Sequence, residues 1–242
     1  MRAYLLESPP LDAYAQMALD EAVLDLLEPD ACALRVYRWR HARFYRGGTV
    51  HGVTFGCSQR FAEVEDSVRG RQGGVTFPLV RRCTGGGIVW HDGDVTFSFV
   101  FPWPRLSPPS RIYRDVHHGA HLGLKAHMLA SRLSGRPSER RPAGLALECF
   151  AGPEQEDLVY EDGSKLLGGA LRRRKGVGLY QGSMRAAGFS VPPERMRRAL
   201  VEGFSLKWAA LFMPCPPRPD MAAAAERLRQ EKYSQDKWNQ KR

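Results

Sequence analysis

The 242-residue chain lacks the patterns that mark several large classes of protein. It has no run of about 18 apolar residues, and its first residues do not show the charged-then-apolar order of a secretory signal, so we expect neither membrane insertion nor export. Its five cysteines are scattered and form no CxxC pair, which disfavours a disulfide framework and a structural zinc site. These absences favour a cytoplasmic protein in which any important cysteine acts as a thiol.

Common catalytic and nucleotide-binding patterns are also missing. The sequence contains no GxGxxG, no Walker loop, no HExxH and no GxSxG, and no internal repeat is visible. Histidines at 117, 118, 121 and 127 include one pair, His117 and His121, that would share a helical face. Since no carboxylate stands at a matching third position, we predict no metal site.

Charge is unbalanced, with 36 Lys and Arg against 26 Asp and Glu, a net charge of +10. The densest basic clusters, at residues 136–141 and 172–175, favour an acidic partner, although a solvated face with no partner remains an alternative. A nucleic-acid site would need aromatic side chains among the charges, and only Tyr180 lies near the second cluster. We therefore expect no nucleic acid and favour an acidic protein surface, with a basic nucleic-acid-binding domain as a remote alternative.

The most informative segment that is present is RRCTGGGIVWHD at residues 81–92, between two apolar, strand-like runs. Consecutive glycines let the backbone approach a ligand closely and turn successive N–H groups toward an oxyanion or a phosphate. Arg81 and Arg82 add positive charge beside them. The segment predicts an acyl or phosphate site, with a plain glycine turn as the alternative.

Hydrophobic periodicity predicts helices at 11–27, 61–68, 110–133, 192–204 and 221–241, and strands at 34–39, 53–55, 95–100, 145–150, 157–160, 166–171 and 177–182. Asp12 and Ser110 are expected to cap the first and third helices. This order favours an α+β fold: a mixed, largely antiparallel sheet with helices packed on one side. At 43% hydrophobic residues we expect a single catalytic domain over residues 1–242, with a core at about 12–205 and a helical tail at about 206–242.

Three segments resemble the lipoate-protein ligase and octanoyltransferase family of the biotin/lipoate protein ligase superfamily. Residues 81–92 are similar to the family signature Arg-Arg-x-Ser/Thr-Gly-Gly-Gly/Arg-x-Val-x-His-Asp. GSKLLGGALRRRK at 163–175, with YQGS at 180–183, is similar to its Gly-x-Lys-Ile-x-Gly-Ser-Ala block and the His/Gln-Gly-Ser/Thr turn that follows. MALDEA at 17–22 and YRW at 37–39 are similar too, so the resemblance spans about residues 15–185.

The resemblance implies the catalytic-domain fold of that family and an enzyme that attaches a lipoyl or octanoyl group, through an amide, to one lysine of a lipoyl domain. The acceptor would be a glycine-cleavage H protein or the acyltransferase subunit of a 2-oxoacid dehydrogenase. An apolar tunnel would hold the acyl chain while the Lys165 ammonium binds its carbonyl oxygen; an ordinary turn lysine is the alternative. The substrate-binding residues it implies are Arg81, Arg82, Thr84, Gly85, Gly86, Gly87, His91, Asp92, Gly168, Gly169, Ala170, Gly182 and Ser183. We expect His91 and Asp92 to hold the loop in place.

Two reactions fit the resemblance. In lipoate ligases, ATP and Mg activate lipoic or octanoic acid as an acyl-adenylate. In octanoyltransferases no cofactor is required, because the octanoyl group passes from an acyl carrier protein thioester to an enzyme cysteine and then to the acceptor lysine. Cys149, in ECFAGP, resembles the Cys-Phe-x-x-Pro-Ser segment that carries this nucleophile in one branch, so the transferase is favoured. A buried, inert Cys149 is the alternative.

The chain also departs from the family pattern. Gly87 matches the ligases, whereas the transferases often have arginine there; Gly169 stands where many relatives have serine; and Glu154 replaces the final serine of the cysteine segment. A ligase that uses a separate accessory polypeptide therefore remains open. Biotin transfer is disfavoured, because the biotin enzymes usually have a Gly-Arg-Gly-Arg loop in place of the glycine triplet.

Overall fold

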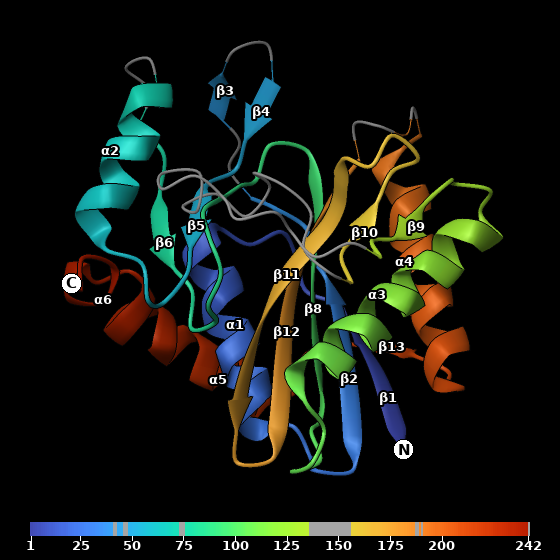
Figure 1. Ribbon diagram of the computed structural model, residues 1–242. Helices are drawn as coiled ribbons and strands as arrows, with labels where there is room; N and C mark the ends of the chain where they lie inside the picture. Colours follow the sequence, from blue (N-terminus) through green and yellow to red (C-terminus); the bar gives the residue numbers. More distant parts are fainter. Residues whose placement is uncertain are drawn as a thin grey trace.

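The computed structural model describes residues 1–40, 43–45, 48–72, 76–135, 156–186, 189 and 191–241. Its centre is an eight-stranded sheet, accompanied by a three-stranded sheet and a short hairpin (Figure 1). In spatial order the large sheet consists of β13 (Met213–Cys215), β1 (Arg2–Leu6), β2 (Ala31–Val36), β8 (Asp94–Pro102), β12 (Val177–Arg185), β11 (Lys165–Arg174), β10 (Leu158–Val159) and β9 (Arg132–Leu133). The first three strands run parallel and the remaining pairs are antiparallel, as the mixed, largely antiparallel prediction required.

Alternation along β8 separates two kinds of side chain. Phe97 and Phe99 are fully buried in a large aromatic core, whereas Thr96 and Ser98 point to the opposite face. Nine residues of β8 pair with β12, from Asp94 opposite Arg185 to Pro102 opposite Val177. This long register fixes which side chains of both strands face the functional site.

Helices cover both faces of the large sheet (Figure 1). One face carries α1 (Ala13–Leu26) and α5 (Pro219–Leu228), and the other carries α3 (Pro109–Ala126) and α4 (Pro193–Trp208). The prediction of helices on one side is therefore wrong, because the sheet buries apolar side chains on both faces. Where α3 crosses α4, a Cβ at Gly123 would lie 1.7 Å from the Ala199 carbonyl oxygen, so only glycine permits this approach.

Several element boundaries agree with the sequence and others do not. Asp12 caps α1 as predicted, since its side chain accepts a 2.8 Å hydrogen bond from the Ala15 N–H. Ser110 does not cap α3, whose N-cap is Pro108, and that helix ends at Ala126, shortly before Met128, which has a left-handed φ of 56°. The predicted strand at 145–150 lies outside the described residues.

The chain termini contribute strands that hydrophobic periodicity did not reveal. Both β1 and β13 are short, and β13 contains Pro214, so neither shows a clear alternating pattern. Beyond them, the expected continuous helix at 221–241 is divided into α5, a π-helical turn η2 (Arg229–Tyr233) and α6 (Asp236–Asn239). None of the helices in the described ranges is long and apolar enough to cross a membrane.

The small sheet positions the glycine motif. It consists of β6 (Leu79–Arg81), β5 (Val53–Phe55) and β7 (Val89–Trp90), and α2 (Phe61–Gln72) packs against it through Val64 and Val68. The hairpin of β3 (Arg43–Tyr45) and β4 (Gly48–Val50) precedes β5. Residues 82–88 connect β6 to β7, so the glycine triplet lies between two strands of one sheet.

Candidate active site

A narrow cavity lies between the small sheet and the α1 face of the large sheet, with about 370 Å³ of empty space including its open mouth. Residues from all three resemblance segments meet in it. Its walls are formed by Met17, Tyr37, Thr54, Arg82, Val89, His91, Thr96, Gly168, Gly169, Ala170, Gln181, Gly182 and Ser183. Of the residues proposed from sequence, it therefore brings together Arg82, His91, Gly168, Gly169, Ala170, Gly182 and Ser183.

One wall is the backbone of β11 and β12, where Gly169 pairs directly with Gly182. A Cβ at Gly169 would lie 2.3 Å from the Tyr180 hydroxyl, and one at Gly182 would lie 2.6 Å from the Phe97 ring. Both rings belong to the aromatic core on the other face. The glycine at 169, where many relatives have serine, is thus explained by Tyr180, which fills the space that a side chain would need.

The glycine loop is held against this wall. Gly86 has a left-handed φ of 85°, and a Cβ there would come within 3.4 Å of the Ala170 side chain. Behind the loop, a Cβ at Gly56 would lie 2.1 Å from the Gly86 carbonyl oxygen. The triplet therefore provides both a positive φ and a close backbone approach. Gly85, Gly86 and Gly87 themselves lie beside the cavity and are not among the residues that line it.

A chain of hydrogen bonds connects the loop to β8. The Arg82 guanidinium donates to the Gly85 and Gly87 carbonyls at 2.8 and 2.9 Å and to the Thr54 hydroxyl at 2.9 Å. Thr54 Oγ1 lies 2.9 Å from His91 Nε2, and His91 Nδ1 lies 3.0 Å from Asp94 Oδ2. Arginine only donates, so the chemically consistent assignment is Thr54 donating to Nε2 and Nδ1–H donating to Asp94.

Asp94, rather than Asp92, is the carboxylate that holds His91. Its Oδ2 also accepts hydrogen bonds from Ser183 at 2.6 Å and Thr96 at 2.7 Å. Burial acts to raise the pKa of Asp94, but His91 and these two hydroxyls outweigh it and keep the pKa below its ordinary value. Asp92 is exposed to solvent as a residue, but protein atoms surround part of its carboxyl group. This partial desolvation and the charge of the nearby Asp94 raise its pKa. The spacing of three residues after His91 was the signal that sequence reasoning missed.

A buried polar cluster that the sequence analysis did not identify closes the α1 side of the cavity. Gln181 accepts a 2.7 Å hydrogen bond from Thr84 and donates one of 2.7 Å to Asp20. Asp20 also binds Arg35 and Tyr37, and it accepts from Ser98 at 2.6 Å. Thr84 thus supports the loop from behind the cavity. Asp20 and Gln181 both stand inside segments that carry the resemblance, at 17–22 and 180–183, and this was the available signal.

Lys165 begins β11 and is buried, but it is not among the residues that line the cavity. Its ammonium lies 2.8 Å from Asp157 Oδ2. Nearby, His117 donates through Nδ1 to the Glu156 carbonyl, and its Nε2 lies 2.6 Å from the Tyr180 hydroxyl. Burial lowers the pKa of His117, although Asp157 opposes this. The catalytic role of Lys165 stays a prediction, and Cys149 lies outside the described residues.

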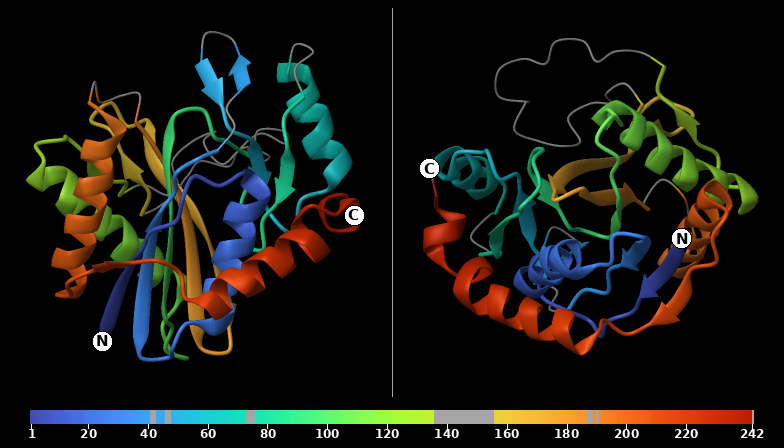
Figure 2. Two further views of the ribbon diagram at one scale, coloured as in Figure 1. Left: turned by 180° about the vertical axis from the view of Figure 1, so that it is seen from behind. Right: turned by 90° about the horizontal axis from the view of Figure 1, so that it is seen from below.

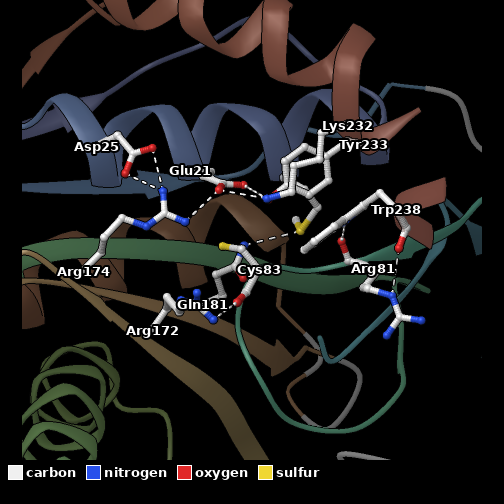
Figure 3. A network of polar contacts seen from close by, with 11 residues as sticks. Glu21, Asp25, Arg81, Cys83, Arg172, Arg174, Gln181, Lys232, Tyr233 and Trp238 are labelled. Atoms are coloured by element: carbon white, nitrogen blue, oxygen red, sulfur yellow. Dashed lines mark hydrogen bonds and ion pairs between the residues drawn. The ribbon is translucent and has the colours of Figure 1, made fainter. Parts of the chain in front are cut away.

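Arg81 is placed differently from the substrate-binding role proposed for it. Its guanidinium donates to the carbonyls of Gln59 at 2.7 Å and of Asn239 at 3.0 Å, and it does not line the cavity. The arginines at 172–175 also contact their own chain: Arg173 donates to the Trp103 carbonyl, and Arg174 donates to Asp25 (Figure 3 shows the Arg174 contact). The basic cluster at 136–141 lies outside the described residues.

The cysteines that the structure describes, Cys32, Cys57, Cys83 and Cys215, are free thiols. Burial raises the pKa of Cys32 to about 11 and that of Cys83 to about 12, so both are poor nucleophiles. In the described part of the chain no group of three or more His, Cys, Asp or Glu side chains could hold a metal ion. His121 instead bonds Ser131, and His127 bonds Glu202.

Comparison with known proteins identifies the family. The family described as lipoyl protein ligase A/B catalytic domain matches residues 12–230. The octanoyltransferase LipM of Kyrpidia tusciae is 28% identical over 97% of this chain and 97% of its own length. That of Staphylococcus aureus is 31% identical over 72% of this chain, and the match spans 62% of its own length.

Solved structures show the same fold. A putative lipoate protein ligase from Thermoplasma acidophilum with bound lipoic acid superposes with a TM-score of 0.78 at 24% identity, covering 100% of both chains. A lipoate-protein ligase A bound with ATP gives a TM-score of 0.78 at 23% identity, covering 99% of both chains. At this identity the likeness concerns the fold alone.

Proposed function

The chain belongs to the lipoyl protein ligase A/B catalytic-domain family, and from this premise we propose that it is an octanoyltransferase. It would move an octanoyl group from an acyl carrier protein thioester to one lysine of a lipoyl domain and join the two through an amide. The observation that carries the proposal is the cavity. One of its walls is the glycine-containing backbone of β11 and β12, and the opposite wall includes Arg82 and His91 of the signature segment. Relatives named octanoyltransferase LipM, similar along 93% or more of both chains, support it.

The lining of the cavity supports the acyl-transfer proposal. Gly168, Gly169 and Gly182 contribute backbone to one wall, and Met17, Val89 and Ala170 add apolar surface for a hydrocarbon chain. Arg82, Thr54 and His91 have fixed positions because each is held in one hydrogen-bonded chain. This chain holds the loop in one shape before the reaction, so the site needs no reorganisation during it.

The proposed reaction has two steps. The Cys149 thiolate attacks the octanoyl thioester carbonyl, the carrier thiolate leaves and takes up a proton, and an enzyme thioester remains. The uncharged amine of the acceptor lysine then attacks this thioester, loses a proton and releases the Cys149 thiolate. The Lys165 ammonium is proposed to bind the carbonyl oxygen in both steps, and its charge would also favour the thiolate of a nearby cysteine. The mechanism uses no redox chemistry, and a reduced thiol suits the cytoplasm.

A second candidate is an ATP-dependent lipoate-protein ligase. The specific observation in its favour is Gly87, a glycine at the position where transferases often have arginine. In the structure the Gly87 carbonyl accepts a hydrogen bond from Arg82. The guanidinium that positions the loop is therefore that of Arg82, and an arginine at position 87 is not needed for this contact. This route would require ATP, Mg and a free acid, and it would leave Cys149 unmodified.

For the acceptor we propose a lipoyl domain, from a glycine-cleavage H protein or a 2-oxoacid dehydrogenase acyltransferase subunit. One of the similar solved structures is a bipartite lipoate protein ligase studied with its E2 lipoyl domain, which makes this class of acceptor a reasonable first choice. The net charge of +10 would attract an acidic domain or carrier protein, and such attraction weakens as salt is added.

The test supplies the purified protein and a lipoyl domain with one of two donors: octanoyl carrier protein without ATP, or ATP, Mg and free octanoate or lipoate. The transferase proposal predicts a mass increase of the acceptor with the first donor, and a hydroxylamine-labile octanoyl adduct on Cys149 that is absent in Cys149→Ala. Cys83→Ala is the matched control and should retain the adduct. Modification with the second donor alone, without an adduct, would establish the ligase instead.

A further inference from the structure

The end of the chain crosses the α1 face of the large sheet and finishes beside the small sheet (Figure 2). After β13, helix α5 packs along α1, η2 continues on α1, and α6 contacts β6. Residues 231–241 lie beyond the range 12–230 matched by the family. We call residues 229–241 the tail segment.

The tail segment supplies both main-chain groups of Arg81 with partners. The Arg81 backbone N–H donates to Asn239 Oδ1 at 2.9 Å, and Trp238 Nε1–H donates to the Arg81 carbonyl at 2.8 Å (Figure 3 shows the Trp238 contact). Two side chains thus take the place of a neighbouring strand along this part of β6. Buried backbone groups require such partners, because an unsatisfied one is costly.

The Arg81 side chain is held by the same segment. Its Nε donates to the carbonyls of Trp238 at 3.1 Å and Asn239 at 3.2 Å, and a second nitrogen donates to the Asn239 carbonyl at 3.0 Å. The guanidinium is 4.7 Å from the centre of the Phe55 ring, on β5. Asn239 itself is buried and fixed, since its amide donates to the Tyr233 and Gln235 carbonyls.

A second anchor joins the tail segment to α1. Tyr233 is fully buried in a cluster with Met17 and Tyr37, both of which line the cavity. Its hydroxyl donates to Glu21 at 2.5 Å, and Lys232 donates to both oxygens of Glu21 at 2.9 and 2.6 Å (Figure 3). The segment therefore supports the cavity from two directions.

We propose that Asn239 is a positioning residue for the acyl-transfer site. Asn239 fixes the backbone of Arg81, the next residue is Arg82, and Arg82 holds the Gly85 and Gly87 carbonyls at the cavity. Asn239 acts entirely through Arg81 and contacts no substrate. The kinetic part of this inference rests on the proposed function; the structural part does not.

The test compares Asn239→Ala with Lys237→Ala, a matched change at an exposed residue of the same helix. Hydrogen exchange is measured on peptides from residues 80–88 and, as an internal reference, from β8 and β12. We expect Asn239→Ala to accelerate exchange at 80–88 by about tenfold or more while the reference strands stay protected, and Lys237→Ala to leave both unchanged.

Kinetics complete the test. Asn239→Ala should lower kcat by about 10- to 100-fold, because a small misplacement of a site costs this much, while KM for the octanoyl donor changes by less than about threefold. Asn239→Asp keeps the acceptor for the Arg81 N–H but loses the amide that donates to the Tyr233 and Gln235 carbonyls, so its kcat should fall between those of Asn239→Ala and the wild type. Exchange and kcat equal to those of the wild type in Asn239→Ala would overturn the proposal.

Two further outcomes are also decisive. If Asn239→Ala unfolds globally, Asn239→Leu replaces it, since this change keeps the branched shape of the side chain and removes the acceptor for the Arg81 N–H; unchanged exchange at 80–88 there would overturn the proposal. If the wild type transfers no octanoyl group, the proposed function fails, but the exchange comparison needs no substrate and still reports on Asn239.

Discussion

The two faces of the large sheet differ in chemistry. Toward α3 and α4, the rings of Phe97, Phe99 and Phe204 form a core of edge-to-face contacts, with ring centres 5.0 to 5.7 Å apart. Toward α1, the sheet buries an ion pair between Asp20 and Arg35 and a set of hydrogen-bonded side chains around the cavity. Aromatic burial needs no directional partners, whereas buried ions and amides fix geometry. The aromatic face therefore contributes mainly cohesion, although Lys165, Asp157 and His117 form a polar group beside it, and the polar face shapes the cavity.

The largest expected effect is on the aromatic face. Phe204→Ala removes a fully buried ring that contacts Phe97, Phe99, Trp208 and Phe212, and it should lower the free energy of unfolding by about 3–5 kcal/mol. Activity per folded molecule should stay at the wild-type level. Urea unfolding with parallel assays checks this. Leu206→Ala, at an exposed position of the same helix, is the control and should change little. A selective loss of turnover in Phe204→Ala would break the division between the faces.

The next effect separates catalysis from stability at Lys165. Removing the ammonium alone would take an ion-pair partner from the buried carboxylate of Asp157, which is destabilising. We therefore expect Lys165→Met/Asp157→Asn to stay folded, with a transfer rate more than about 100-fold below wild type. Asp157→Asn alone should keep much more activity than the double variant. Steady-state rates and thermal melts measure both, and wild-type turnover in the double variant would remove Lys165 from the mechanism.

A smaller effect tests where the two faces meet. Gly169→Ser restores the residue of many relatives, but its Cβ would collide with Tyr180, so we expect a loss of about 1–3 kcal/mol in the free energy of unfolding. Combining it with Tyr180→Ala should give less than the sum of the two single losses, because the collision with the ring is then absent and only the 2.7 Å approach to the Gln181 carbonyl oxygen remains. A double-mutant cycle in urea measures this coupling. Strict additivity of the two losses would show that Tyr180 is not the reason why position 169 requires glycine.

The smallest effect concerns the polar face under acid. Burial acts to raise the pKa of Glu21, but hydrogen bonds from Lys232 and Tyr233 outweigh it and lower the pKa below the ordinary 4.5. A lowered folded-state pKa means that the stabilisation is complete above the unfolded value and is lost as pH falls through the folded value. Glu21→Gln should therefore be less stable than wild type by about 1 kcal/mol at neutral pH, and the difference should shrink below pH 4.5. Denaturant titrations at several pH values test this, and a constant difference would contradict it.

Sequence patterns predicted the helices and strands in which apolar residues recur at regular intervals. The helix capped by Asp12 and the long strands β8, β11 and β12 follow from periodicity, since each buries at least one regular face. The edge strand β13, its neighbour β1 and the broken tail segment did not follow. The conformation of these segments depends on partners that are distant in the sequence, as when Cys215 of β13 pairs with Leu6 of β1. A local sequence pattern does not reveal which distant segment will pair.

The candidate site shows the same limit. Motif resemblance selected glycines and His91 that meet at the cavity, but it could not distinguish Asp94 from Asp92 or assign Arg81 to the tail segment. The choice in each case depends on which partner the folded chain brings within hydrogen-bond distance. Asn239, 158 residues from Arg81 along the chain, is the clearest example.

The central claim is that the acyl chain occupies the cavity between the glycine-lined wall and the signature loop. An octanoyl carrier protein with a photoreactive diazirine at the end of its acyl chain tests this directly, with labelled peptides identified by mass spectrometry after irradiation. The account predicts labels at cavity residues such as Met17, Val89 and Ala170, and competition by unlabelled octanoyl donor. Labels on the α3 and α4 face of the sheet, unaffected by that competitor, would contradict it.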